Sequence, residues 1–326
     1  MRLADPVFAG LINPPDLCTV RPFSMLALLQ RLITFALIAL ACSWWFYFRG
    51  SWPLLATAGF LLILFAYTGF LALEFIILRY INRSDPAPQP GWAELLRAWV
   101  GETLTAPQVF CWRQPFRSNA IPDNLSPMGL AHGLRGVVFV HGFFCNRGLW
   151  NPWLERLKGQ GHAFVAVNLE PLFGSIDGYV PQIEMAVRQV TLVTGLPPLL
   201  VCHSMGGLAA RAWLQAMKSE ARVHHVVTIG TPHRGTWLAR FGHGHNGRQM
   251  RLLSDWQTRL DHDMPADRHA GFTCWYSNCD NIVFPTSTAT LPGADNRLVR
   301  GVAHVQMAFL PSIMDATLDM LQHKPV

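Results

Sequence analysis

Ser204 is the residue of this 326-residue chain whose surroundings point most directly to chemistry. An apolar stretch that begins at Leu199 and is typical of a strand stops at this serine, and a helical stretch over 206–218 follows. A serine on a sharp turn between strand and helix projects its hydroxyl away from the backbone, and the helix N-terminus favours developing negative charge. Gly206 and Gly207 let the two backbones approach closely. The sequence therefore predicts that Ser204 is a nucleophile.

Two downstream residues have the types that a serine nucleophile needs as partners. Asp280 stands just past the apolar stretch 272–276, and His304 follows the stretch 297–302. Parallel strands present their catalytic groups at one edge of a sheet, so both side chains would meet Ser204 there. We predict that His304 is the general base and that Asp280 orients it and stabilises its charged form. The aspartates of the polar stretch 255–267 are the rival acids, but they do not follow a strand.

Backbone N–H groups near Ser204 could stabilise the negative charge of a reaction intermediate. The apolar stretch 137–140 runs into His141, Gly142 and Phe143. A loop after an earlier strand, paired with the amide that follows the nucleophile, is the usual source of such donors. We therefore predict an oxyanion hole made by the N–H groups of Phe143 and Met205.

Aromatic residues close to this loop have two interpretations. Phe144 and Trp150, together with Phe143 and Trp153, could line a pocket for an acyl chain, and we take Phe144 and Trp150 as candidate substrate-binding residues. They could equally pack a helix on the sheet. Residues 237–270 are long for a connection and leave open whether a cap or a decorated loop lies there.

The elements that must position these residues alternate between two types. Apolar stretches typical of strands covered on both faces lie at 137–140, 163–167, 199–201, 223–229, 272–276 and 297–302. Helical stretches lie near 149–159, 179–194, 206–218 and 312–322. This alternation predicts an α/β fold with a mostly parallel, doubly covered sheet. Before it, 92–104 could form a helix on a membrane surface, and 108–113 a leading strand.

The N-terminal part is almost free of charge. Residues 32–48 and 52–73 contain no ionisable acid or base, and the second run alone is long enough to span the hydrocarbon core of a bilayer. We predict two transmembrane helices at about 26–48 and 52–77. Arginines before the first span and after the second outnumber the single Arg49 between them, which places both termini in the cytoplasm. A buried core hairpin and a cleaved signal peptide are the alternatives.

Composition and breaks in the pattern give the expected parts of the chain. Only 14% of the residues are charged and 51% are hydrophobic, which excludes a disordered protein. The net charge of +6 comes from scattered arginines, so we expect weak attraction to membranes and no nucleic-acid partner. Three prolines within 84–91 end the second span. We expect a membrane anchor at 1–83, a Pro-rich linker and lead-in at 84–133, and a catalytic domain at 134–326.

Five short motifs together resemble the lipase and esterase branch of the α/β-hydrolases. They are Val-His-Gly-Phe at 140–143, Cys-His-Ser-Met-Gly-Gly at 202–207, Thr-Ile-Gly-Thr-Pro-His-Arg-Gly-Thr at 228–236, Asp-x-x-Val-x-Pro at 280–285 and Gly-Val-Ala-His at 301–304. The segment around Ser204 departs from the Gly-x-Ser-x-Gly nucleophile elbow because Cys202 stands where the first glycine is usual. Residues 134–326 are similar to small bacterial triacylglycerol lipases, in which nucleophile, acid and histidine follow in this order. The membrane hairpin is not part of the resemblance.

The resemblance implies hydrolysis of carboxylic esters through an acyl-enzyme, without a cofactor or metal. Combined with the hairpin, it leads us to expect a lipase or esterase in the inner membrane of a bacterium, with its catalytic domain in the cytoplasm and a lipid or other acyl ester as substrate. A thioesterase or acyltransferase would use the same triad. A membrane interaction module that keeps the fold without the chemistry is the remaining alternative, and the oligomeric state stays open.

Overall fold

A single sheet of parallel strands forms the centre of the molecule. The computed structural model describes residues 24–125 and 133–321 of the chain. The strands are β1 (Val137–Val140), β2 (Phe164–Val167), β3 (Leu199–His203), β4 (His225–Ile229), β5 (Phe272–Ser277) and β6 (Asp295–Val299). They pair in the order β2-β1-β3-β4-β5-β6, and every pair is parallel. The predicted α/β fold class is confirmed.

Helices precede, connect and follow the strands. Before the sheet lie α1 (Met25–Phe48), α2 (Pro53–Ile81), α3 (Trp92–Pro107) and α4 (Gln114–Arg117). Between and after the strands lie α5 (Asn151–Leu157), α6 (Val180–Thr194), α7 (Met205–Met217), α8 (His245–Gln249), α9 (Asp255–Asp263), α10 (His304–Met307) and α11 (Pro311–Asp319). Helices α8 and α9 occupy the long connection 237–270.

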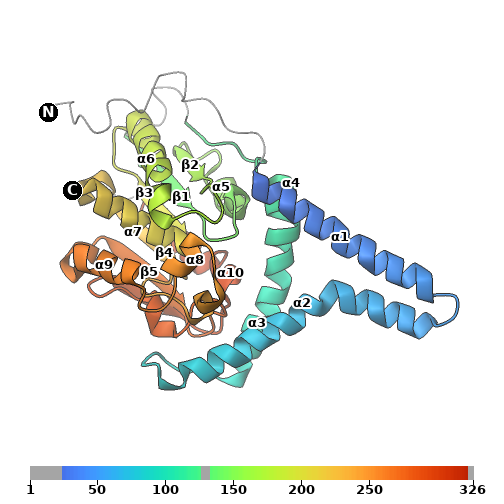
Figure 1. Cartoon of the computed structure of the whole chain (residues 1–326). Helices are drawn as coiled ribbons and strands as arrows, with labels where there is room; N and C mark the ends of the chain where they lie inside the picture. The colour runs from blue at the N-terminus through green and yellow to red at the C-terminus, as the bar shows by residue number, and fades with distance from the viewer. Residues whose placement is uncertain (1–23, 126–132, 322–326) are drawn as a thin grey trace.

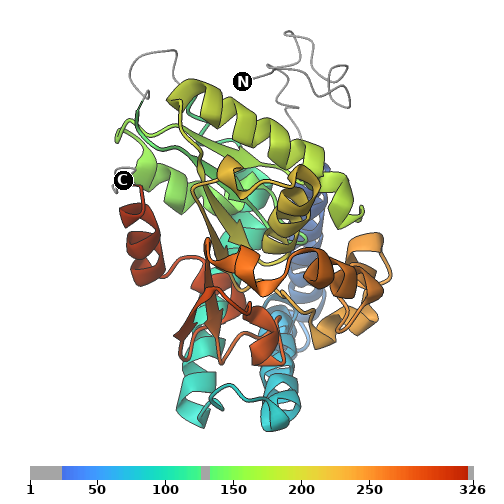
Figure 2. The ribbon, with the colours of Figure 1, turned by 90° about the vertical axis from the view of Figure 1, so that its left-hand side faces the viewer.

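Both faces of the sheet are buried under helices. Successive side chains of a strand point to opposite faces, and in β1 this sends Val138 to one apolar cluster and Val137 to the other. The first cluster contains residues of α6 and α7, and the second contains residues of α5 and α11. In Figure 2 the long helix α6 lies along the upper side of the sheet. Helix α11, drawn in red, lies at the left of this view, away from α6. This double cover explains why most of the strands are continuous apolar runs.

Helices α1 and α2 form a hairpin that projects from the rest of the molecule (Figure 1). The spans Met25–Phe48 and Pro53–Ser84 are long and apolar enough to cross a membrane, with mean hydropathies of 2.1 and 2.4. Only 22% and 17% of their most apolar windows are buried, whereas the core helix of a soluble protein is mostly buried. At the base of the hairpin, α3 packs against both α2 and α10.

The predicted leading strand at 108–113 is wrong. Gln108–Arg113 is a π-helical turn that continues α3, and the predicted helix from Trp92 therefore runs further than expected. Pro107 explains the change of winding, because it has no N–H to donate to the carbonyl of Thr103. The hydroxyl of Tyr67 in α2 donates a hydrogen bond of 3.0 Å to that carbonyl instead. The apolar residues of this stretch thus pack as a helix beside the hairpin.

Candidate active site

Ser204 lies on the sharp turn between β3 and α7, where the sequence placed it. Its φ of +54° is rare for a residue with a side chain and costs about 1–3 kcal/mol. Three hydrogen bonds hold this backbone: Ser204 N–H donates to the carbonyl of Ile229 (2.9 Å), and its own carbonyl accepts from the Thr231 hydroxyl (2.8 Å) and from Gly207 N–H (3.1 Å). The strained turn is therefore fixed by the neighbouring strand β4 and by the first turn of α7.

The glycine after Met205 allows α7 to start against the end of β1. A Cβ at Gly206 would lie 2.3 Å from the carbonyl oxygen of Val140, closer than real Cβ atoms approach. Cys202, which replaces the usual first glycine of the elbow, is fully buried. Its side chain belongs to the apolar cluster that includes α6 and α7, so this departure from the motif is accommodated by the core.

Asp280 and His304 form a buried pair at the same edge of the sheet. Nδ1 of His304 lies 2.9 Å from both Oδ1 and Oδ2 of Asp280. Oδ1 of Asp280 also accepts hydrogen bonds from the N–H groups of Ile282 (3.0 Å) and Val283 (2.8 Å), which fix the carboxylate. With Nδ1–H donating to Asp280, the Nε2 atom of His304 is the one left to act as a base.

The electrostatic surroundings of His304 favour its charged form. Burial lowers the pKa of His304, whereas the charge and hydrogen bond of Asp280 and the charges of Glu102 and Glu74 raise it, and the resulting pKa lies above the usual 6.5. A base of this kind accepts a proton readily near neutral pH. The basicity of His304 thus suits a residue that takes a proton from a hydroxyl.

Three polar residues around His304 were not found from the sequence. Asn281 accepts a hydrogen bond from His304 N–H at 3.2 Å and donates one to Glu74 of α2 at 2.7 Å. Glu102 of α3 accepts hydrogen bonds from the two N–H groups that follow His304. Burial raises the pKa of Glu102 to about 7, although these hydrogen bonds oppose the shift. A lone glutamate in an apolar span was the available signal for Glu74.

The loop after β1 lies directly beside the serine. A Cβ placed on Gly142 would lie only 2.6 Å from Cβ of Ser204. His141 fixes this loop, because its Nδ1 donates to the carbonyl of Gly142 (2.9 Å) and its Nε2 accepts from Leu169 N–H (3.0 Å). Burial lowers the pKa of His141 to about 4, so the ring is neutral. Phe143 follows in this loop.

Met205 is the first residue of α7, so its N–H has no acceptor within the helix. The segments that carry the N–H groups of Met205 and Phe143 both adjoin Ser204: Met205 follows it directly, and Phe143 follows Gly142, whose added Cβ would touch it.

The candidate substrate-binding residues differ in placement. Phe143 is 37% exposed, and its ring lies 5.8 Å from that of the exposed Phe173. Phe144 is half-buried and has a φ of +55°. Trp150 is fully buried, with its ring 5.0 Å from Phe139 of β1. The structure therefore brings the two phenylalanines to the loop beside Ser204, whereas Trp150 packs the core under the sheet.

Two further histidines near the site are neutral and structural. The ring of His203 lies 4.7 Å from that of His304, and its Nε2 donates to the carbonyl of His304 at 3.3 Å. His233 is fully buried, and its Nε2 lies 3.1 Å from the Thr228 hydroxyl. Burial, the largest influence in both cases, holds the pKa of each well below its usual value.

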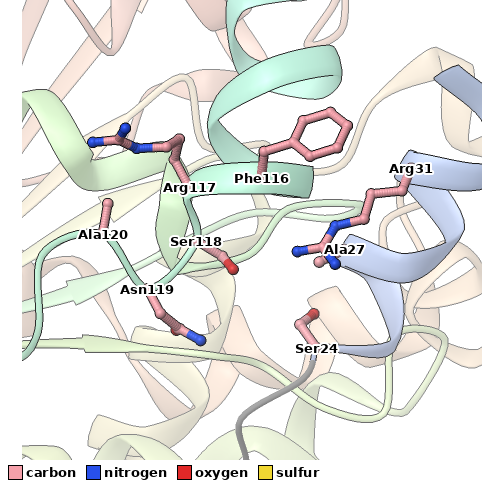
Figure 3. A pocket seen from close by; sticks show the side chains of 8 residues that line it. All are labelled: Ser24, Ala27, Arg31, Phe116, Arg117, Ser118, Asn119 and Ala120. Atoms are coloured by element: carbon pink, nitrogen blue, oxygen red, sulfur yellow. The ribbon is translucent and has the colours of Figure 1, made fainter. Parts of the chain in front are cut away.

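A cavity of about 370 Å³ lies away from these residues, between the start of α1 and the segment after α4. Figure 3 shows the guanidinium of Arg31 and the hydroxyls of Ser24 and Ser118 directed toward this space. Over residues 24–125 and 133–321, no group of three or more histidines, cysteines or acids is arranged to hold a metal ion.

Comparison with known proteins agrees with this architecture. The mature lipase BlEst2 of Bacillus licheniformis has a TM-score of 0.52 and 17% sequence identity, over 60% of this chain and 96% of that one. Lipase B of Aspergillus fumigatus has a TM-score of 0.52 and 18% identity, over 61% of this chain and 55% of that one. These likenesses show a shared fold. Residues 137–321, more than half of the chain, match the alpha/beta hydrolase family, and the protein belongs to that family.

Proposed function

We propose that this protein is a membrane-anchored serine hydrolase that cleaves the carboxylic esters of lipids. The observation that carries the proposal is the buried Asp280–His304 pair at the sheet edge where the strained Ser204 turn also lies. Two lipases of the same fold support ester hydrolysis as the reaction class. The hydrolase domain would comprise residues 134–326, and residues 1–83 would form the anchor.

The proposed reaction has two halves, with Ser204 as the nucleophile. Nε2 of His304 takes the proton of the Ser204 hydroxyl as Oγ attacks the ester carbonyl, and then gives it to the departing alcohol. Asp280 holds the imidazole and stabilises its charged form. The N–H groups of Phe143 and Met205 stabilise the oxyanion, at about 3 kcal/mol per donor. Water then cleaves the acyl-enzyme by the same proton transfers, and this requires no cofactor.

The substrate class follows from the surroundings of the site. The hairpin α1–α2 would hold the enzyme in the membrane, where lipid esters are concentrated. Helix α3 supports this placement, because Trp92, Leu96, Val100 and Leu104 recur every four residues and are all exposed. Such an apolar stripe suits the boundary between headgroups and acyl chains. Phe143 and Phe144 would contact the acyl chain.

A fluorophosphonate probe tests whether Ser204 is activated. Membranes containing the full-length protein are expected to be labelled, and Ser204→Ala and His304→Ala are each expected to abolish labelling. His262→Ala is the matched control, since this histidine is 88% exposed on α9. Absence of labelling of the folded wild-type protein would support the non-catalytic membrane module instead.

Product analysis distinguishes an ester hydrolase from a thioesterase or an acyltransferase, which would use the same triad. The purified enzyme is given vesicles containing a diacylglycerol, a matched acyl thioester, or the diacylglycerol with an added alcohol acceptor. Release of free fatty acid from the ester is expected. Preferential cleavage of the thioester, or acyl transfer to the alcohol, would replace the proposed activity by that of a thioesterase or an acyltransferase.

We further propose that the anchor lies in the inner membrane of a bacterium with both termini in the cytoplasm. The arginines that flank the two spans support this orientation. A reporter fused after Val326 is expected to be active only in its cytoplasmic form, and activity of an exported-side reporter would reverse the topology.

A further inference from the structure

We infer that Glu102 and Glu74, contributed by the helices before the hydrolase fold, are positioning residues for His304. This inference rests on the proposed function, because it concerns the same catalytic site. According to this inference, α2 and α3 contribute residues to that site. An anchor that only tethers the enzyme would not affect the position or the basicity of His304.

Glu102 supports the backbone directly after the histidine. Its Oε1 and Oε2 accept hydrogen bonds from the N–H groups of Val305 and Gln306, each at 3.0 Å. His304 begins the short helix α10, whose first N–H groups have no acceptor within the helix. One carboxylate from α3 therefore satisfies two of these donors and fixes the start of α10. The residue is buried, at 2% exposure, so water does not compete for them.

Glu74 reaches the histidine through one intermediate. Its Oε2 accepts from Nδ2 of Asn281 at 2.7 Å, and Oδ1 of Asn281 accepts from His304 N–H at 3.2 Å. Asn281 follows Asp280 directly and is fully buried. A chain of two hydrogen bonds thus joins α2 to the loops that carry both the acid and the base.

Apolar contacts around these two hydrogen bonds keep the same elements together. Phe75 and Leu78 of α2 and Ala98 of α3 share a buried cluster with Cys279, which precedes Asp280, and with Ala303, which precedes His304.

Further along, Asn82 exchanges hydrogen bonds with Thr286 at 2.8 and 3.2 Å, and Asp85 accepts from the hydroxyl and N–H of Ser287. The contacts between the N-terminal helices and the two loops are therefore an extended interface.

The two glutamates also act through charge. Four titratable residues face His304: Asp280 beside its ring, His203 with its ring tilted against it, Glu74 from α2 and Glu102 from α3. His203 is neutral, so the charged forms of the carboxylates set the sign of the field. Burial raises the pKa of Glu102 to about 7, so its contribution to this field grows as the pH rises through neutrality. Removing a carboxylate while keeping its shape should therefore make His304 less basic, a result that loss of packing alone would not produce.

The test uses Glu102→Gln and Glu74→Gln in the full-length, detergent-solubilised enzyme, with Glu155→Gln on the exposed face of α5 as control. The rate constant for inactivation by a fluorophosphonate is measured from pH 5 to 9 together with the melting temperature. Glu102→Gln loses one of two backbone acceptors, so we expect the rate at its optimum to fall by up to about 100-fold. Its acidic limb should move to lower pH, because the charged form of Glu102 raises the pKa of His304.

Glu74→Gln isolates the effect of charge, because the new amide oxygen can still accept from Asn281. A shift of the acidic limb with a largely preserved optimum rate is expected, and this variant decides the question if Glu102→Gln does not fold. If the acidic limbs of the folded variants stay at the wild-type pH, the inference is wrong, whereas the proposed hydrolase activity is unaffected. Failure of the wild-type enzyme to react, by contrast, would remove the proposed function itself.

Discussion

Nδ1 of His304 lies 2.9 Å from each carboxylate oxygen of Asp280, although 24 residues separate the two in the chain. The same carboxylate accepts the N–H groups of Ile282 and Val283, so it is fixed before any substrate arrives. Asp280→Asn should keep much of this geometry but lose the charge and favour the wrong imidazole tautomer. We expect kcat to fall by about 10⁴-fold. Ester hydrolysis by the folded variant checks this, and near-normal turnover would remove Asp280 from the triad.

The pH dependence of the reaction should follow His304. The base works only when neutral, so kcat/KM should fall as pH falls through its pKa, which lies above 6.5. Since Asp280 raises this pKa, Asp280→Asn should move the acidic limb to lower pH. The acidic limb of each enzyme is measured from pH profiles of kcat/KM for a soluble short-chain ester, with the wild-type enzyme and with Asp280→Asn. An acidic limb well below pH 6.5 in the wild-type enzyme would contradict the assignment of the base.

The start of α7 should be intolerant of any side chain at Gly206. A methyl group there meets the carbonyl of Val140, and overpacking of this kind costs about 1–3 kcal/mol of stability. Gly206→Ala is therefore expected to lower the melting temperature and the rate of fluorophosphonate labelling together. Gly178→Ala is the control, because nothing lies within 4 Å of its added Cβ. Equal stability of the two variants would show that the turn yields more easily than its contacts indicate.

Trp150 and Phe143 should respond in opposite ways to truncation. Trp150→Ala removes a fully buried ring and should cost about 3–5 kcal/mol of stability. Phe143→Ala removes a partly exposed ring beside the site, so it should raise KM for long acyl chains and leave stability nearly unchanged. Thermal unfolding and KM across an ester chain-length series compare them. A raised KM in a stable Trp150→Ala enzyme would restore Trp150 as a substrate-binding residue.

Much of the fold could be predicted from the sequence because its strands are covered on both faces. A continuous apolar run such as 137–140 is distinctive, and β1 has these bounds. The stretch 108–113 was misread because its residues suit a strand equally well. Its helical state depends on packing against α1 and on the burial of Val109 in the second apolar cluster, contacts that local patterns do not contain.

The candidate site could be predicted for those residues that directly follow a strand. Ser204, Asp280 and His304 each follow a strand, and parallel strands bring such residues to one edge. Glu102 was hidden because its contact with Val305 crosses 203 residues and its spacing with Leu95 and Ala98 marks only a buried helix face. Trp150 had two interpretations in the sequence, and only the packing of Phe139 distinguishes between them.

The position of Glu74 within the second hairpin helix also bears on how the enzyme is made. In the proposed membrane-anchored hydrolase, the hydrogen bond from Asn281 to Glu74 would form only once α2 has folded against the catalytic domain. On that proposal, the segment that carries Asp280 and Asn281 would gain this support when the hairpin enters the bilayer. Insertion of the hairpin and completion of the proposed active site would then be coupled steps in the synthesis of the enzyme.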